Sequence, residues 1–194
     1  MPSCLFCEAN TLTRGCIFPG WTIADFPQTS YTPRQIRETH GISKSSKQFT
    51  AECEVSIVCG SCYSGWMNRI EGRARPILRP LINGIEPALL TADNQRRLAV
   101  WACLRAYIVE VADRTRAKYS TRNERVAFVA NHQRIPPDNT IVWLARLLGP
   151  EHRGGDICGS KRKVLLTHTS TVDALQACNF YIGKVAFQLL QWRG

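Results

Sequence analysis

The sequence has no apolar run that approaches the roughly 20 residues needed to span a bilayer. It also has no internal repeat and no low-complexity tract. The N-terminus reaches Cys4 without the basic segment and apolar core of a signal peptide. We therefore expect a cytoplasmic protein, whose thiols stay reduced. At 194 residues, with 44% apolar and 21% charged side chains, the chain can bury a core as one domain or as two small ones.

Catalytic motifs are missing from the C-terminal half. It shows no nucleophile–base pair and no glycine-rich loop of the kind that cradles phosphates. His132, His152 and His168 are scattered there, with no partner at a ligand spacing. Any chemistry is therefore expected at the N-terminal end.

Cysteine is present in an odd number, nine, which counts against a complete disulfide framework. Two Cys-x-x-Cys pairs, Cys4/Cys7 and Cys59/Cys62, predict a tetrahedral zinc site, because each pair forms a tight turn that directs both thiolates at one ion. The pairs are 51 residues apart, so the intervening chain must leave the metal and return to it. The second pair opens into a predicted short helix at 64–70, the layout of a treble-clef site. The other cysteines are expected to be mostly small core residues: Cys16, Cys53, Cys103, Cys158 and Cys178.

The net charge of +10 is unevenly distributed along the chain. Residues 1–70 carry 6 basic and 5 acidic side chains, residues 71–135 carry 12 and 6, and residues 136–194 carry 7 and 4. A polyanion is therefore attracted chiefly to the middle block. Its basic residues are almost all arginine, which binds phosphate through two parallel hydrogen bonds. The competing interpretation is that these arginines lie on solvated faces of the protein and bind no partner.

Local patterns predict a mixed structure. Strict apolar alternation over 49–57 indicates a strand that leads into Cys59. Pro76 and Pro80 predict that residues 73–82 are extended or irregular. Thr91 can cap a helix that runs to about residue 114, and the sequence Thr121–Glu124 matches a capping box.

The last sixty residues favour strands at 140–148, 163–169 and 180–190, rich in β-branched and aromatic residues. The fold class we expect is α+β, with an N-terminal zinc module (1–84) followed by a long helix and an antiparallel β-rich part (85–194). The two parts form either separate units or one continuous domain.

The N-terminal part resembles a bacterial and phage family of HNH-endonuclease-like zinc proteins. Family members open with Cys-x-x-Cys and a Thr-x-Glu-His-x-x-Pro-x-Trp segment. They continue after a long excursion with Val-Cys-x-x-Cys-Asn-x-Gly-Trp-Met and a proline-rich stretch. The resemblance covers about residues 4–110, and it implies a ββα-metal core with structural zinc. The matching residues are Cys4, Cys7, Thr13, Pro19, Trp21, Val58, Cys59, Cys62, Gly65, Trp66, Met67, Pro76, Leu78, Pro80, Leu81, Ile82, Gln95, Leu98, Ala99 and Trp101.

The functional positions of the family are substituted in this sequence. The resemblance implies a histidine general base at the end of the first strand, and an Asn or His after the second cysteine pair that helps hold Mg²⁺ or Mn²⁺. Here the Glu-His pair is Gly15-Cys16, and the residue after the second pair is Tyr63. A thiolate is a soft ligand, and a phenol is a poor ligand for magnesium, which prefers hard oxygens. Cys16 and Tyr63 are therefore the candidate positions of a degenerate catalytic site.

Three functions follow from this sequence. The first is a zinc-stabilised HNH-like protein that binds nucleic acid, chiefly the duplex DNA backbone, without cleaving it. The second is an active HNH endonuclease that uses Mg²⁺ or Mn²⁺. The third is a phage or mobile-element factor that binds a host protein. For the first, the predicted phosphate contacts are Arg69, Arg73, Arg75 and Arg79.

Overall fold

The structure is a computed structural model that describes residues 3–22, 54–85, 89–112, 120–131, 135–148, 162–165 and 171–193. It is an α+β structure with two antiparallel sheets, as the sequence predicts. The basic loop at 43–47, His132, His152, His168, Cys53 and Cys158 lie outside the described residues. Among the described helices, none is both long and apolar enough to cross a membrane.

The N-terminal sheet is a pair of short strands. Strand β1 (Leu12–Cys16) lies antiparallel to β2 (Glu54–Cys59), with Leu12 opposite Cys59 and Cys16 opposite Glu54. The register shifts between Thr13 and Gly15. The described part of the predicted strand therefore delivers the chain into Cys59 as expected.

A helical segment follows β2 without a break. Helix α1 (Gly60–Cys62) passes through a π-helical turn (Tyr63–Met67) into α2 (Asn68–Ile82). Gly65 has non-helical backbone angles, which marks a kink in this segment.

The prediction of an irregular segment at 73–82 is wrong, because α2 includes both Pro76 and Pro80. Each proline removes one backbone N–H from the helix, but Pro76 is exposed and Pro80 is only half-buried. The opposite face carries four buried residues at helical spacing: Ile70, Ala74, Leu78 and Ile82. Burial of this stripe favours the helix by more than the two missing hydrogen bonds cost it.

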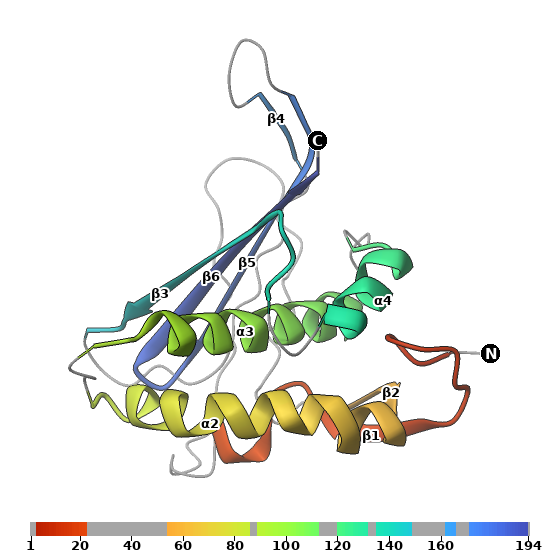
Figure 1. Ribbon diagram of the computed structural model, residues 1–194, viewed down its shortest axis with the longest axis horizontal. Coiled ribbons are helices and arrows are strands. Elements are labelled where there is room, and N and C mark those ends of the chain that lie inside the picture. Colours follow the sequence, from red (N-terminus) through yellow and green to blue (C-terminus); the bar gives the residue numbers. More distant parts are fainter. Residues whose placement is uncertain are drawn as a thin grey trace, which may run out of the picture.

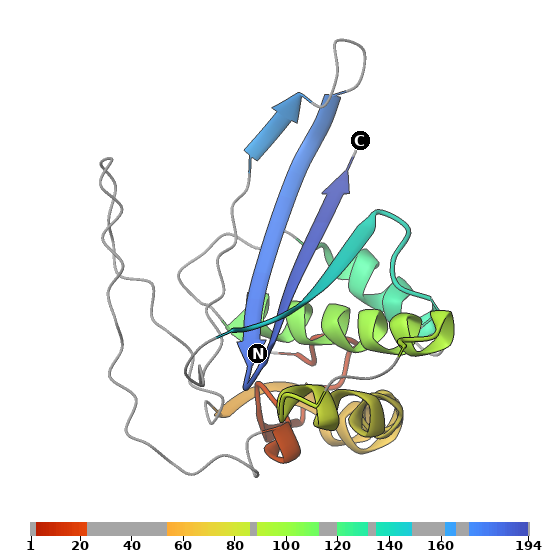
Figure 2. The ribbon, with the colours of Figure 1, turned by 90° about the vertical axis from the view of Figure 1, so that its left-hand side faces the viewer.

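The central element is α3 (Ala92–Ala112), which lies between α2 and the larger sheet (Figures 1 and 2). Thr91 caps it as predicted, since the Asn94 backbone N–H donates to Thr91 Oγ1 at 3.2 Å. Every residue from Val100 to Val109 is buried. The helix is therefore covered on all sides in this stretch, rather than on the single stripe that the sequence indicates.

Helix α4 (Arg122–Asn131) begins with the predicted capping box. The Thr121 backbone N–H donates to Glu124 Oε2 at 2.6 Å, and the Glu124 N–H donates to Thr121 Oγ1 at 3.2 Å.

The larger sheet has the strand order β3-β6-β5-β4 and is antiparallel throughout. Its strands are β3 (Thr140–Arg146), β4 (Arg162–Leu165), β5 (Thr171–Ile182) and β6 (Val185–Arg193). The prediction of one strand at 180–190 is wrong, because the chain reverses at Gly183 and Lys184. Ile182 pairs with Val185 across this turn, and Gly183 has a φ of 56°, which favours glycine.

The hairpin tip is attached to α2. The Lys184 backbone N–H donates to the Ile82 carbonyl at 3.0 Å, and the Lys184 carbonyl accepts from the Leu147 N–H at 2.8 Å. Buried aromatic rings join the sheet to α3: Phe180 and Phe187 stack at 4.9 Å, and both contact Trp101. One buried cluster thus contains residues from both sides of position 84, while the division into two domains remains a prediction.

Candidate metal centre

The first cysteine pair is held against β2 by backbone hydrogen bonds. The Cys4 N–H donates to the Ala9 carbonyl at 2.8 Å, which closes a tight turn around Cys7. The Leu5 N–H donates to the Ile57 carbonyl at 2.8 Å. The turn is therefore fixed beside the end of β2, where the second pair begins.

The second pair spans the junction of β2 and α1. Cys59 is the last residue of β2, and Cys62 is the last residue of α1. The Cys59 backbone N–H donates to Cys4 Sγ at 3.3 Å, which joins the two pairs directly. Cys4, Cys59 and Cys62 are buried and Cys7 is half-buried.

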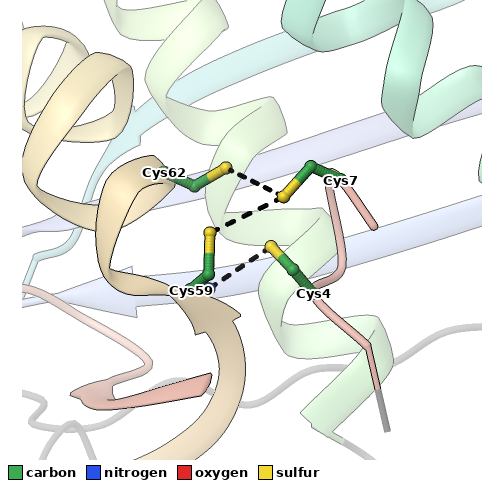
Figure 3. Close-up of side chains that lie close together, drawn as sticks. All are labelled: Cys4, Cys7, Cys59 and Cys62. Carbon is green, nitrogen blue, oxygen red and sulfur yellow. Dashed lines mark hydrogen bonds between the residues drawn. The ribbon is translucent and has the colours of Figure 1, made fainter. Parts of the chain in front are cut away.

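The four thiol groups converge on one point (Figure 3). Cys7 Sγ lies 3.6 Å from Cys59 Sγ and 3.8 Å from Cys62 Sγ, and all four sulfur atoms lie within 4.8 Å of one another. Zinc–sulfur bonds of about 2.3 Å in a tetrahedron place the sulfur atoms about 3.8 Å apart. These distances and four sulfur donors therefore fit a tetrahedral ion such as zinc.

Burial and hydrogen bonds shift the pKa values of the clustered thiols in different directions. Burial raises the pKa of Cys59, but the Cys62 backbone N–H and the neighbouring thiols lower it to about 7. At Cys62 burial dominates and raises the pKa, against a lowering hydrogen bond from Trp66. At Cys7 the Ala9 backbone N–H lowers the pKa, but burial and the Cys4 and Cys59 thiols raise it by more. The pKa of Cys7 is therefore above its usual value. Ionisation of one thiol thus makes ionisation of the thiols beside it less favourable. A bound cation offsets the repulsion between the thiolates.

Aromatic side chains enclose the four-cysteine cluster on one side. Phe6, inside the first pair, contacts Trp66 edge-on with ring centroids 4.9 Å apart. Trp66 in turn contacts Phe128 of α4 at 6.2 Å. The Arg125 side chain donates to the Leu5 carbonyl at 3.3 Å. The cluster is thus packed against α4 as well as formed by the N-terminal elements.

No family model matches this chain, and neither a curated protein nor a solved structure shows significant similarity to it.

The candidate catalytic positions lie at the far end of β1 and at the start of the π-helical turn. An added Cβ at Gly15 would lie 3.0 Å from Cε2 of Tyr63, so the Tyr63 ring packs over the Gly15 backbone. Because side chains alternate along a strand, position 15 faces Tyr63 and Cys16 is directed to the opposite face. Cys16 is not a member of the four-cysteine cluster. The structure thus brings Tyr63 to Gly15.

A buried ion pair lies nearby and was missed in the sequence. Arg105 of α3 is 3% exposed, and its guanidinium contacts Glu71 Oε1 of α2 at 2.5 Å. It also donates to the Ile17 carbonyl at 2.7 Å, and the Trp101 indole N–H donates to Glu71 Oε2 at 2.9 Å. Burial lowers the pKa of Arg105, and the charge of the Glu71 carboxylate opposes this. The sequence signal was an arginine on the apolar stripe of the predicted helix.

The four predicted phosphate-binding arginines are all exposed on α2. They form two pairs one turn apart, Arg69/Arg73 and Arg75/Arg79, on either side of a ridge that contains Gly72 and Pro76. The Arg75 guanidinium lies 5.9 Å from the Trp21 ring centroid. The only acidic residue of α2, Glu71, is turned inward with a side-chain exposure of 13%. The charges that α2 presents to solvent are therefore all positive.

Proposed function

We propose that this chain is a zinc-stabilised, HNH-like ββα protein that binds the nucleic-acid backbone through α2 and does not cleave it. The observation that carries the proposal is the outward charge of α2. Its four arginines are exposed, while its one carboxylate is half-buried and turned toward Arg105. A helix of this charge attracts phosphate regardless of base sequence.

The connection of the four-cysteine cluster to α2 supports the same proposal. Two antiparallel strands lead through the second cysteine pair into one helical segment, which is the strand–strand–helix order of the HNH-like core that the sequence resembles. A metal ion at this junction would fix the start of the helical segment. The arginines would then be presented on a rigid element, which lowers the entropy cost of binding.

The residues Gly15, Cys16 and Tyr63 are the reason to expect no cleavage. No histidine stands at position 15 or 16, and the Tyr63 ring lies where a side chain at position 15 would project. A metal-dependent nuclease requires a general base and hard oxygen or nitrogen ligands near one point. This set of residues supplies neither.

The binding test measures affinity for a fluorescein-labelled DNA duplex against salt concentration. Four phosphate contacts predict a slope of log K against log salt of about −3 to −4, or about 100-fold weaker binding between 50 and 200 mM salt. Replacing Arg69, Arg73, Arg75 and Arg79 together by glutamine should abolish most of this slope.

The matched control removes the same charge from other elements, by glutamine at Arg14, Arg96, Arg122 and Arg146. These four are also exposed. The control variant should keep a slope near that of the unchanged protein. Equal losses in both variants would mean that binding follows net charge alone, and the assignment to α2 would be wrong.

The nuclease test is nicking of supercoiled plasmid in Mg²⁺ or Mn²⁺. We expect no metal-dependent cleavage, because none of the residues that the structure describes is a histidine that could act as a general base of the HNH type. Nicking that disappears in a Cys59→Ala variant would contradict this expectation. A triple variant, Gly15→Glu with Cys16→His and Tyr63→Asn, tests whether the scaffold supports cleavage once the family residues are restored.

A further inference from the structure

A cavity of about 350 Å³ is lined in part by Tyr107 of α3. It is bounded by α3, α4, the segment 135–139 that precedes β3, and the end of β6. Figure 1 shows α4 beside the C-terminal part of α3. Its volume falls within the range of small-ligand pockets, roughly 300–1,000 Å³. None of the functions considered for α2 or for the four-cysteine cluster uses it.

The floor of the cavity is built from buried polar side chains. Tyr107, Ser120 and Gln191 are 3%, 5% and 7% exposed. The Gln191 side-chain amide donates to Thr140 Oγ1 at 3.2 Å, and it also hydrogen-bonds Tyr107, whose pKa is raised by burial. These groups join α3 to β3 and β6. The floor is therefore held in place before any ligand arrives.

Ser120 is fixed on two sides. Its backbone N–H and its hydroxyl donate to the two carboxylate oxygens of Glu110, at 2.9 and 2.5 Å. Arg125 Nη1 donates to the Ser120 carbonyl at 2.7 Å and to its hydroxyl at 2.9 Å. A network in which each member has partners is rigid, so the shape of this end of the cavity is defined.

The walls are apolar and the rim is acidic. Phe128, Trp192, Pro136 and Pro137 form flat apolar surfaces. Two carboxylates line the cavity: Glu124, which the capping box holds in place, and the exposed Asp138. Among the lining residues that the structure describes, none is lysine or arginine.

This charge is opposite to that of the molecule as a whole, which carries a net +10. A phosphate or carboxylate ligand would meet two negative charges in the lining, and the nearby Arg125 guanidinium already donates to the Ser120 carbonyl and hydroxyl. A positively charged ligand would be attracted by both carboxylates, and its apolar body would contact aromatic and proline rings.

The geometry points to a binding site for a compact organic cation with a flat apolar body, such as an aromatic amidine or guanidine. The charged group lies toward Glu124 and Asp138, and the flat body lies between the apolar walls near Phe128 and Trp192. The site is separate from the four-cysteine cluster and from the arginines of α2.

The test is isothermal titration of the full chain with benzamidine, with benzamide as the uncharged analogue and benzoate as the anionic one. Benzamidine should bind saturably at one site, at least about tenfold more tightly than benzamide, and benzoate should not bind. Glu124→Gln with Asp138→Asn should weaken benzamidine by about tenfold. Glutamine at position 124 retains the capping box, so the fold should be unaffected.

A second variant fills the cavity instead of removing its negative charges. Ala127 of α4 is exposed and lines the cavity, so Ala127→Phe should abolish binding. Its neighbour Val126 is also exposed but is not among the lining residues, so Val126→Phe should bind as the unchanged protein does. Absence of saturable benzamidine binding, equal affinity for benzamide, or full binding in a folded Ala127→Phe protein would each overturn the assignment.

Discussion

We expect the four-cysteine cluster to hold a metal ion whose removal lowers the midpoint of thermal unfolding by at least about 10 °C. Zinc bound by four thiolates contributes of order 10 kcal/mol in small zinc domains, and roughly 2–4 °C accompanies each kcal/mol in a chain of this length. In this protein the four sulfur atoms connect the N-terminal turn, β2 and α1. Without the ion, the segment before β1 should separate from β2, and Trp66 should become exposed. Treatment of the unchanged protein with a chelator should lower the unfolding midpoint as much as the Cys59→Ser substitution does.

The measurement combines native mass spectrometry with tryptophan fluorescence during heating. We expect one metal ion per chain in the unchanged protein and none in Cys59→Ser. Acidification should also release the ion, because protons compete with it for the four thiolates.

The matched control is Cys16→Ser, which changes a half-buried thiol of β1 outside the four-cysteine cluster. It should keep the ion and should change stability by less than about 1 kcal/mol. Equal metal content and stability in Cys59→Ser and in the unchanged protein would exclude a structural metal at this cluster.

Breaking the buried ion pair should have the second-largest effect. Arg105→Met should reduce the free energy of unfolding by about 3–5 kcal/mol, because it leaves the Glu71 carboxylate inside the protein without its cation. The Ile17 carbonyl also loses its donor, which adds to the cost.

A double-mutant cycle separates the pair from its surroundings. The second substitution, Glu71→Gln, removes the charge and keeps an oxygen for the Trp101 indole N–H. The double variant should lose less stability than the two single variants together, because no unpaired charge remains. Urea unfolding of the four proteins measures this difference.

The control for position 105 is an exposed pair on the same helix. Arg97 contacts Asp93 at 2.6 Å, with side-chain exposures of 44% and 56%. Arg97→Met should therefore cost less than about 1 kcal/mol. A similar small loss in Arg105→Met would mean that the buried pair does not connect α2 to α3 in solution.

Short-range signals in the sequence were sufficient to predict several features of the structure. The Thr121–Glu124 capping box and the Thr91 cap predicted the starts of α4 and α3, because these interactions involve residues only three positions apart. The two cysteine pairs predicted a four-sulfur cluster, because each pair already directs two thiols to one side of a turn.

Long-range packing decided the elements that the sequence predicted wrongly. Pro76 and Pro80 indicate a break, but the buried stripe that includes Ala74 and Leu78 holds α2 helical as far as Ile82. At the C-terminal end, apolar alternation continued across Gly183, so periodicity alone could not indicate the reversal between β5 and β6.

The sequence by itself determined the four cysteines that could hold a metal ion, the starts of α3 and α4, and the excess of arginine over residues 69–79. Only the tertiary structure decided that Glu71 turns inward to Arg105, that Tyr63 lies over Gly15, and that an acidic cavity forms between α3, α4 and β6. The physical reason is distance along the chain. Caps and cysteine pairs are formed by near neighbours, whereas a buried ion pair or a cavity depends on which helices and strands pack together.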